Sequence, residues 1–526
     1  MLAPSLLSLL LLGGLVQADR TVKVSKSAPK DAGKPWPDFV SYSIEFSSLF
    51  DYAGNRSNPN TYSLNLLNNI ARLTGTKSVI RVGGATQDRT IFNPTQKQGY
   101  IGVIVPAISA DFPGIVNIGP SFFESYQTWP GYTFTHGLNY GNLAVLNSTI
   151  ASIPYACKGI PSLLAFEYGN EPDLYILFRL RNATTWNDQY YVDEWTRTLG
   201  TLQSTITTSC PQFSSSLSLY GPTFAGLRKG DINGLTTLDP TLSWRDGLST
   251  SPINYLATHN YMNIASAPGI SLQGTLMNHT AIRAVVAGIV QLGTNLPNRQ
   301  PPLVLGEHNS LAQQGRPGLS DTFGAALWGL TYNTAAAAQG VKRQHMHQGT
   351  NYRYQMWQPV DTNFSARATK PAYYGNVALA AFLGEMGGGE KEGGKTSVAD
   401  LWKESGDTGA VYGAWKGGRL RRVLVVDLRE WNGTEANVYK NQGTRKTGRY
   451  VLDLAKGVEC EGKVKRLEAV GADARDGVTF DGVSYDFERK QGKPVRVKRE
   501  SQEKAKRVKG SLVVEVPWSS AAIIEC

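Results

Sequence analysis

The sequence has little charge, few cysteines and few long apolar segments. Only 18% of its 526 residues are charged and 41% are hydrophobic, a balance that excludes a largely disordered chain. Beyond residue 18, no apolar stretch is long enough to span a bilayer. The four cysteines are too far apart for the spacing of a zinc site. We therefore expect no membrane span, no metal ion and no cofactor.

The net charge of +11 is concentrated near the C-terminus. Residues 489–509 contain ten Lys or Arg and two Glu, so the rest of the chain is close to neutral. Such a distribution does not favour a nucleic-acid-binding protein. We interpret this basic segment as a solvated surface, with attraction to an acidic polysaccharide as the alternative.

The N-terminus has the pattern of a secretory signal peptide. Residues 1–18 contain the apolar run Leu6–Val16, followed by small residues at positions 16 and 18. We expect cleavage after Ala18, secretion to the extracellular space and a monomeric product. Six Asn-x-Ser/Thr sequons agree with that route, and we expect glycans at Asn55, Asn147, Asn182, Asn278, Asn363 and Asn432.

The four cysteines suggest two disulfides in an oxidising compartment. Four cysteines allow three pairings, and free buried thiols are the alternative. We favour Cys157–Cys210 and Cys460–Cys526, because each pair then stays within one predicted domain.

Strand-like and helix-like segments alternate from residue 39 to about 349. Eight strand-like runs separated by helical patterns predict an α/β fold, the (β/α)8 or TIM barrel. Helical spacing is clear at 190–207 and 280–292. The eight runs are 39–49, 77–85, 133–138, 162–168, 217–222, 253–259, 302–306 and 341–347.

The chain changes character after about residue 375. Short alternating runs separated by turn signals predict a C-terminal all-β sandwich. The runs are 410–415, 421–427, 450–454 and 510–516. The strand-like segment 21–25 precedes the barrel and could pair into this sandwich. We therefore predict a signal peptide at 1–18, a barrel at 30–374, and a sandwich made of 19–29 with 375–526.

Two glutamates follow two different strand-like runs of the predicted barrel. In AFEYGNEPD, Pro172 stops strand pairing and leaves Glu171 at the rim of the sheet. In LVLGEHNS, Glu307 stands in the same situation. Strand C-termini carry the active sites of such barrels, and two carboxyls, one protonated and one ionised, are what glycoside hydrolysis requires.

Each glutamate alone is more often an exposed loop residue than a catalytic one, so the pair carries the argument. Glu167, four residues before Glu171, could face the same side of its strand. We interpret Glu167 as a buried structural carboxylate paired inside the barrel. His345 and His347 could both face the barrel interior and, with His259, bind a metal, but barrel lining is the preferred interpretation.

Over about residues 30–526 the chain resembles glycoside hydrolase family 79, which contains β-glucuronidases and heparanase. The resemblance implies that Glu171 is the acid/base and Glu307 the nucleophile of a retaining enzyme, with carboxyls roughly 5–5.5 Å apart. The matching motifs are SYSIEFSSLF (41–50), IRVGGATQD (80–88), FEYGNEPD (166–173), THNYM (258–262), LGEHNS (305–310), SDTFGAALW (320–328) and GTNY (349–352).

The same resemblance places substrate-binding residues around the two glutamates. It implies that Glu45 faces sugar hydroxyls and that His259 and Tyr261 form an aromatic-rich wall, with Tyr261 able to reach the nucleophile. Asn170 can donate its amide to a sugar hydroxyl, and Tyr352 matches a substrate-facing tyrosine after the eighth strand. For each of these substrate-binding candidates, the alternative role is packing in the barrel wall.

The loop after Glu307 departs from the family pattern. Family members bind the sugar carboxylate there, largely with a tyrosine and backbone amides. This chain has Ala312-Gln313-Gln314-Gly315, so we assign the contact to Gln314 and Gly315. The departure leaves open whether glucuronic acid or its 4-O-methyl form is preferred.

Three functions follow from these observations. The first is a secreted retaining exo-β-glucuronidase acting on uronic-acid glycans or glycosides. The second is an endo-acting, heparanase-like hydrolase of uronate-containing polysaccharide. The third is a glycan-binding barrel without catalysis, which would require the two carboxyls to lie far apart.

Overall fold

The fold is that of a computed structural model, which describes residues 20–385, 395–404, 406–434 and 443–526. The predicted signal peptide lies outside these residues. Within them, no helix combines the length and the apolar character that crossing a membrane requires.

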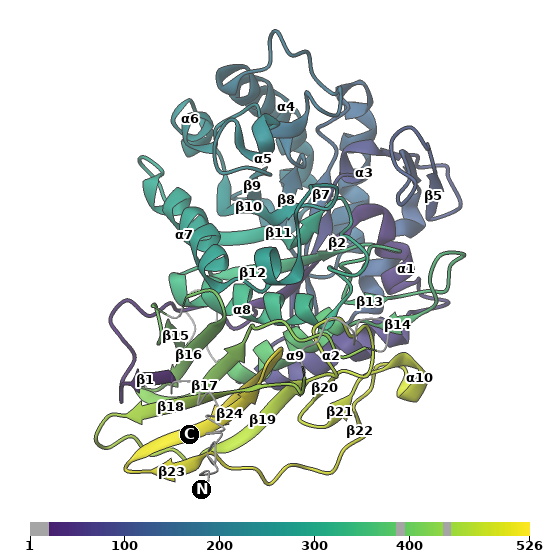
Figure 1. The fold of residues 1–526 in the computed structure, drawn as a ribbon. Coiled ribbons are helices and arrows are strands. Elements are labelled where there is room, and N and C mark those ends of the chain that lie inside the picture. The colour runs from purple at the N-terminus through teal and green to yellow at the C-terminus, as the bar shows by residue number, and fades with distance from the viewer. Residues whose placement is uncertain (1–19, 386–394, 405, 435–442) are drawn as a thin grey trace, which may run out of the picture.

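Eight parallel strands close into a barrel, as the eight strand-like runs predict (Figure 1). Each strand pairs with the next one along the chain, and β12 closes the circle by pairing with β2. In chain order the strands are β2 (Val40–Glu45), β3 (Val79–Gly83), β7 (Thr133–Leu138), β8 (Leu163–Tyr168), β9 (Leu219–Phe224), β10 (Ile253–Ile264), β11 (Leu303–Ala312) and β12 (Arg343–Gln348).

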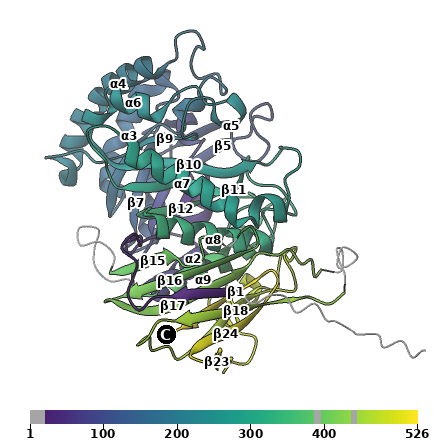
Figure 2. The same ribbon diagram turned by 60° about the vertical axis from the view of Figure 1, so that its left-hand side comes forward.

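Helices connect the barrel strands and cover the outside of the barrel (Figures 1 and 2). The helical patterns at 190–207 and 280–292 correspond to α4 and α7. The helices are α1 (Leu49–Ala53), α2 (Thr61–Thr74), α3 (Leu146–Gly159), α4 (Asp188–Ser209), α5 (Asp231–Gly234), α6 (Pro240–Arg245), α7 (His279–Asn295), α8 (Phe323–Gln339) and α9 (Pro371–Leu383).

A small sheet extends the connection after the second barrel strand. It has the strand order β4-β6-β5, with bounds Thr90–Phe92 for β4, Tyr100–Val103 for β5 and Ile115–Ile118 for β6. Val116 and Ile118 are buried, whereas Ile101, Val103 and Ile115 are exposed. The sheet therefore packs through one face and leaves the other open.

A two-stranded ribbon, β13 (Trp357–Gln358) with β14 (Ala368–Thr369), follows the last barrel strand.

The C-terminal part forms the predicted all-β domain from two sheets. The first has the order β1 (Arg20–Val24), β18 (Thr447–Leu454), β24 (Ser511–Pro517) and β23 (Lys506–Val508). The second has the order β15 (Thr396–Asp400), β16 (Gly409–Lys416), β17 (Arg419–Asp427), β25 (Ser520–Glu525), β19 (Lys463–Glu468), β20 (Thr479–Phe480), β21 (Val483–Ser484) and β22 (Val495–Arg496). In the chain, a short helix, α10 (Phe487–Lys490), lies between β21 and β22.

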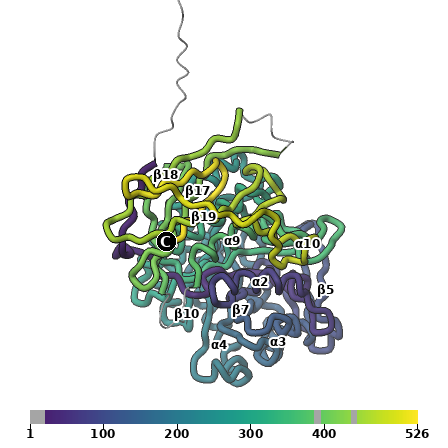
Figure 3. The backbone as a smooth tube through the Cα atoms, turned by 90° about the horizontal axis from the view of Figure 1, so that it is seen from below, coloured from purple at the N-terminus to yellow at the C-terminus, as the bar shows by residue number. Residues whose placement is uncertain are grey.

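Helices α8 and α9 lie between the barrel and the β-domain. Every residue of α8 from Phe323 to Ala338 is buried, because the helix packs against the barrel on one side and β15 on the other. Helix α9 packs against α8 and α2, and in Figure 3 α9 lies between β19 and α2. The expected domain boundary at residue 374 thus falls inside α9.

The first described strand belongs spatially to the C-terminal domain. β1 pairs in parallel with β18, with Val22 opposite Leu452 (Figure 2). Val22 and Val24 are buried in the second hydrophobic core, between the two sheets of that domain. The described part of the chain therefore starts in the β-domain before it enters the barrel.

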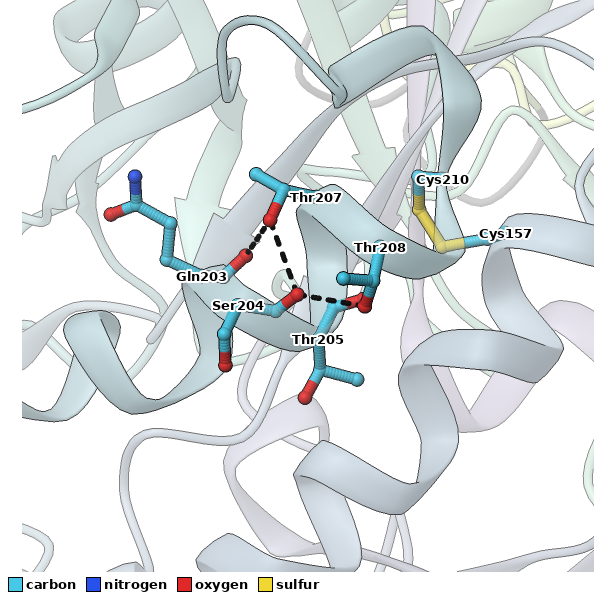
Figure 4. The surroundings of a disulfide bond; sticks show 7 residues. All are labelled: Cys157, Gln203, Ser204, Thr205, Thr207, Thr208 and Cys210. Atoms are coloured by element: carbon cyan, nitrogen blue, oxygen red, sulfur yellow. Dashed lines mark hydrogen bonds between the residues drawn. A yellow bond between two sulfur atoms is a disulfide. The ribbon is translucent and has the colours of Figure 1, made fainter.

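Two disulfides are present, with the favoured pairing. Cys157 in α3 is bonded to Cys210 at the C-terminal end of α4 (Figure 4). Cys460 is bonded to Cys526, so the last residue of the chain is tied to the loop before β19. Each crosslink joins segments of one domain.

We predict that replacing Cys157 and Cys210 with serine lowers the free energy of unfolding by about 4 kcal/mol, because the crosslink closes 53 residues of the unfolded chain. Differential scanning calorimetry at one scan rate should show a lower melting temperature. The control is Thr208→Ser, on the turn beside Cys210 (Figure 4), which leaves the crosslink intact. Equal melting temperatures for the double variant and this control would contradict the prediction.

Candidate active site

The barrel brings Glu171 and Glu307 to the same rim. Glu307 lies within β11, where it is opposite His259 of β10 in the parallel register. Glu171 lies three residues beyond β8, in the left-handed backbone region with φ 51°. That conformation is strained for a residue other than glycine, and such strain clusters at functional sites. Its amide donates to the Thr223 carbonyl at 3.1 Å, which fixes the strained turn.

The two carboxyls face each other across a short gap. A carboxylate oxygen of Glu171, one of Glu307 and a ring nitrogen of His259 all lie within 4.8 Å of one another. The Glu307 side chain is 8% exposed and that of Glu171 is 14% exposed. Two carboxyls this close match the separation in a retaining glycosidase, about 5–5.5 Å, rather than the wider separation in an inverting one.

Arg81 of β3 lies at the centre of the site and is fully buried. Its Nη1 donates to Glu307 Oε2 at 2.5 Å, and its Nε donates to Glu167 Oε2 at 3.0 Å. Nη2 donates to the Asn170 side-chain oxygen at 2.8 Å. Glu167 is therefore a paired structural carboxylate, as predicted, and Arg81 connects it to the Glu307 carboxylate.

The surroundings of Glu307 favour its ionised form. The Tyr261 hydroxyl donates to Oε1 at 2.7 Å. Burial by itself would raise the pKa of the Glu307 carboxyl, but donors and cations outweigh burial and hold that pKa well below its usual range. In order of effect these neighbours are His347, His259, Arg81 and Tyr261, and His259 has this effect only at acid pH, where its own ring is protonated.

The surroundings of Glu171 favour its protonated form. Burial, and then the negative charge of Glu307, raise the pKa of the Glu171 carboxyl to about 8. Its hydrogen-bond partner is His259, whose Nδ1 lies 3.0 Å from Oε1. Burial lowers the pKa of His259 to about 4, so this ring is neutral at pH 7. A neutral ring can donate to the ionised carboxylate or accept from the protonated one.

Glu45 and Tyr352, which the family resemblance implies as substrate-binding residues, contact each other beside the two glutamates. The Tyr352 hydroxyl donates to Glu45 Oε2 at 3.1 Å, and Thr86 donates to Oε1 from both its amide and its hydroxyl. His347 connects this pair to Glu307, with Nε2 3.4 Å from Glu45 Oε2 and Nδ1 3.6 Å from Glu307 Oε2. This carboxylate is held rigidly, as a hydroxyl-binding group needs to be.

Asn170 is held from two sides. Its side-chain oxygen accepts from Arg81, and its backbone amide donates to Asp88 at 2.9 Å. Asp88 is buried and also accepts from the Tyr175 hydroxyl at 2.6 Å. Since the Asn170 oxygen is occupied, its amide nitrogen is the group that can donate to a sugar hydroxyl.

Gln314 and Gly315 lie in the turn after β11, close to Tyr354. A side chain at Gly315 would come within 3.0 Å of the Tyr354 amide nitrogen, and φ is +80° there, so only glycine fits. The Tyr354 ring packs 5.9 Å from that of Tyr261, and the two hydroxyls are 3.4 Å apart. Tyr354 therefore supplies an aromatic beside the loop that lacks one.

Four site residues are outside the set that the sequence predicts: Arg81, Asp88, His347 and Tyr354. The sequence does single out Arg81, because it is a charged residue in the middle of an apolar strand. His347 is considered in the sequence analysis only as a possible metal ligand. The other histidine of that pair, His345, faces Tyr220 instead, with Nε2 3.3 Å from its hydroxyl. His345 therefore lines the barrel.

The cluster of Glu171, His259 and Glu307 also has the spacing of a cation site. Arg81 already supplies a positive charge 2.5 Å from Glu307. A divalent ion at this point would be repelled by that guanidinium and would displace the Tyr261 hydrogen bond. The arrangement therefore suits an acid and a nucleophile better than a metal.

Comparisons with known proteins agree with this geometry. Residues 411–523 match the family model described as the glycosyl hydrolase family 79 C-terminal beta domain. A β-glucuronidase of Aspergillus niger is 40% identical, covering 97% of this chain and 94% of its own. A β-glucuronidase of Neurospora crassa is 39% identical, covering 96% of each chain.

A solved structure of a 4-O-α-L-rhamnosyl-β-D-glucuronidase from Fusarium oxysporum shares the fold. Its TM-score is 0.75 at 23% identity, over 96% of this chain and 100% of that one. The likeness to this structure extends over the barrel and the β-domain together. With near-full-length relatives at about 40% identity, the chain belongs to glycoside hydrolase family 79.

Proposed function

We propose that this protein is a retaining exo-β-glucuronidase, which releases β-linked glucuronic acid, with or without a 4-O-methyl group, from glycans or glycosides. The observation that carries the proposal is the pair Glu171 and Glu307, whose carboxylate oxygens lie within 4.8 Å of each other and whose pKa values are shifted in opposite directions. The β-glucuronidase relatives support the substrate.

In the first step Glu307 attacks the anomeric carbon. The bond from that carbon to the aglycone oxygen breaks, and Glu171 gives its proton to the departing oxygen. The product is a glycosyl ester of Glu307. The Asn170 amide can donate to the 2-hydroxyl, a contact that strengthens in the oxocarbenium-like transition state.

In the second step a water molecule attacks the anomeric carbon. Glu171, now ionised, takes a proton from that water, and the ester bond to Glu307 breaks. The neutral His259 ring can serve both steps as a donor, because its Nδ1–H can donate to Oε1 whether Glu171 carries its proton on Oε2 or is ionised. Release of the sugar returns Glu307 to its ionised form and leaves the proton on Glu171.

The alternatives are less well supported. A glycan-binding barrel without catalysis would leave the opposed pKa shifts of two facing carboxyls without a use. An endo-acting hydrolase is disfavoured because both near-full-length relatives are named β-glucuronidases. Cleavage of internal bonds in a uronate polymer, detected by size-exclusion chromatography, would restore that alternative.

We further propose that the protein acts as a secreted monomeric glycoprotein. Two disulfides support an oxidising compartment, and the site is complete within one chain. The basic segment near the C-terminus is partly ion-paired, for example Lys498 with Glu468, as a solvated surface would be. Among the sequon asparagines, Asn147, Asn182 and Asn363 are exposed, whereas Asn55, Asn278 and Asn432 are half-buried.

We predict that Glu307→Gln abolishes turnover of an aryl β-glucuronide, because an amide cannot attack the anomeric carbon. The loss should exceed about a thousandfold in kcat, as for other groups that act directly in the transition state. Circular dichroism checks that the variant is folded. A kcat within tenfold of the parent value would remove the nucleophile assignment.

We predict that Glu171→Ala slows turnover and that azide restores it on a substrate with an activated aryl leaving group. Such a leaving group needs little protonation, and azide can replace the water that Glu171 activates. The product expected is the β-glucuronosyl azide, detected by NMR. If the variant loses no rate and gains none with azide, Glu171 is not the acid/base.

We predict a pH profile of kcat/KM with an alkaline limb near pH 8, where Glu171 loses its proton.

Tyr261→Phe removes a donor to ionised Glu307, so the pKa of Glu307 rises and the acid limb moves to higher pH. Tyr332→Phe is the matched control, since its hydroxyl donates to Asn260 and not to a carboxylate. An acid limb that stays in place or moves to lower pH in Tyr261→Phe would contradict the prediction.

A further inference from the structure

The turn after β11 has an unusual backbone conformation. Gln313, Gln314 and Gly315 are consecutive, and all three have positive φ angles of 62°, 62° and 80°. Two of the three are not glycine, and the left-handed region is unfavourable for such residues. A run of this kind persists only where the surrounding structure holds it.

Arg353, in the loop after β12, holds this turn. Its backbone amide donates to the Gln314 carbonyl at 2.8 Å. Its side chain donates to the Gly315 carbonyl from Nε at 3.2 Å and to the Gln313 carbonyl from Nη2 at 3.3 Å. One residue therefore binds three successive carbonyls. In a trans peptide the C=O and N–H groups point in opposite directions, so the N–H groups that follow these carbonyls are directed away from Arg353. The last of them, on Arg316, donates to the Ser320 hydroxyl.

Asp111 fixes the Arg353 guanidinium from the other side. Arg353 Nη1 donates to Asp111 Oδ1 at 2.9 Å, and the two side chains are only 25% and 30% exposed. Asp111 belongs to the connection between β5 and β6, in the small sheet after the second barrel strand. The ion pair thus ties this connection to the turn after the nucleophile strand.

The residues on either side of Arg353 are site residues. Tyr352 donates to Glu45, and Tyr354 packs against Tyr261, which donates to Glu307. In an eight-stranded barrel the eighth strand is diametrically opposite the fourth. The loop with Arg353 therefore bounds the end of the site that is farthest from Glu171.

The far end of a bound sugar is the end that carries its acidic group. Glu171 protonates the oxygen on C1, so the C4 and C5 side of the ring, with the C6 carboxylate of a uronic acid, lies toward the opposite strands. Charged groups of both signs lie near this end. Burial lowers the pKa of Lys370, and among its neighbours Asp321 raises that pKa whereas Arg475 and Arg353 lower it.

We propose that Arg353 is a positioning residue for uronate recognition. By holding the carbonyls of residues 313–315, it presents the opposite, N–H side of the turn to the sugar carboxylate. Converging N–H groups bind anions without a charged side chain. The proposal rests on the proposed function, and it assigns the selectivity for an acidic sugar to a residue that does not contact the reacting atoms.

The test compares an aryl β-glucuronide with the aryl β-glucoside, which differs only in lacking the carboxylate. We expect Arg353→Ala to lower kcat/KM for the glucuronide at least about thirtyfold, mainly through KM, and to change the glucoside value less than about threefold. Arg353→Lys keeps the charge and the backbone bond to Gln314, but it lacks the planar guanidinium that binds the Gly315 and Gln313 carbonyls together, so it should lose nearly as much. Asp111→Asn should lower kcat/KM for the glucuronide about threefold.

The matched control is Asp31→Asn, which breaks an ion pair with Lys403 of the same 2.9 Å length, far from the site. Competitive inhibition by glucuronic acid and by glucose gives the same comparison without turnover. Equal losses for both sugars would show a merely structural role, and full activity of Arg353→Lys would show that charge alone matters; either result overturns the proposal.

If Arg353→Ala does not fold, Arg353→Lys and Asp111→Asn test the proposal instead. The proposal is overturned if neither variant changes the ratio of kcat/KM for the glucuronide to kcat/KM for the glucoside. A parent enzyme that hydrolyses the glucoside and not the glucuronide would instead refute the proposed function, before any variant is compared.

Discussion

The site depends on one buried cation. Arg81 lies inside the barrel with no exposed surface and binds the carboxylates of Glu167 and Glu307. A buried guanidinium without partners is strongly unfavourable, so both glutamates are needed to keep it there. The charge around it is already negative when both are ionised. A further negative charge on Glu171 is therefore unfavourable, and the proton that catalysis requires stays on Glu171.

Glu171 and Glu307 differ in their donors more than in their burial. Glu307 accepts from Arg81 and Tyr261, and both contacts favour its charged form. Glu171 has the neutral His259 as its partner and the charge of Glu307 across the gap. Two chemically identical side chains, both nearly buried, thus favour opposite protonation states through their neighbours, as the proposed acid and nucleophile require.

The architecture was accessible from the sequence because parallel barrel strands are buried on both faces and read as continuous apolar runs. The proximity of Glu171 and Glu307 was accessible because polar residues at strand ends break those runs. The role of Arg81 was not, because its partners Glu167 and Glu307 are 86 and 226 residues away. A charge within an apolar strand shows that a partner exists, and only the closed barrel shows which one.

The loop after Glu307 shows a different limit of sequence reasoning. Its pattern lacks an aromatic, and Tyr354 from the loop after β12 lies beside it instead. Neighbouring parallel strands lie about 4.8 Å apart, so side chains from two adjacent loops can reach the same volume. Comparing one loop with a family pattern position by position does not detect a side chain that an adjacent loop supplies. Arg353 follows the same logic, because it belongs to one loop by sequence and determines the backbone of another.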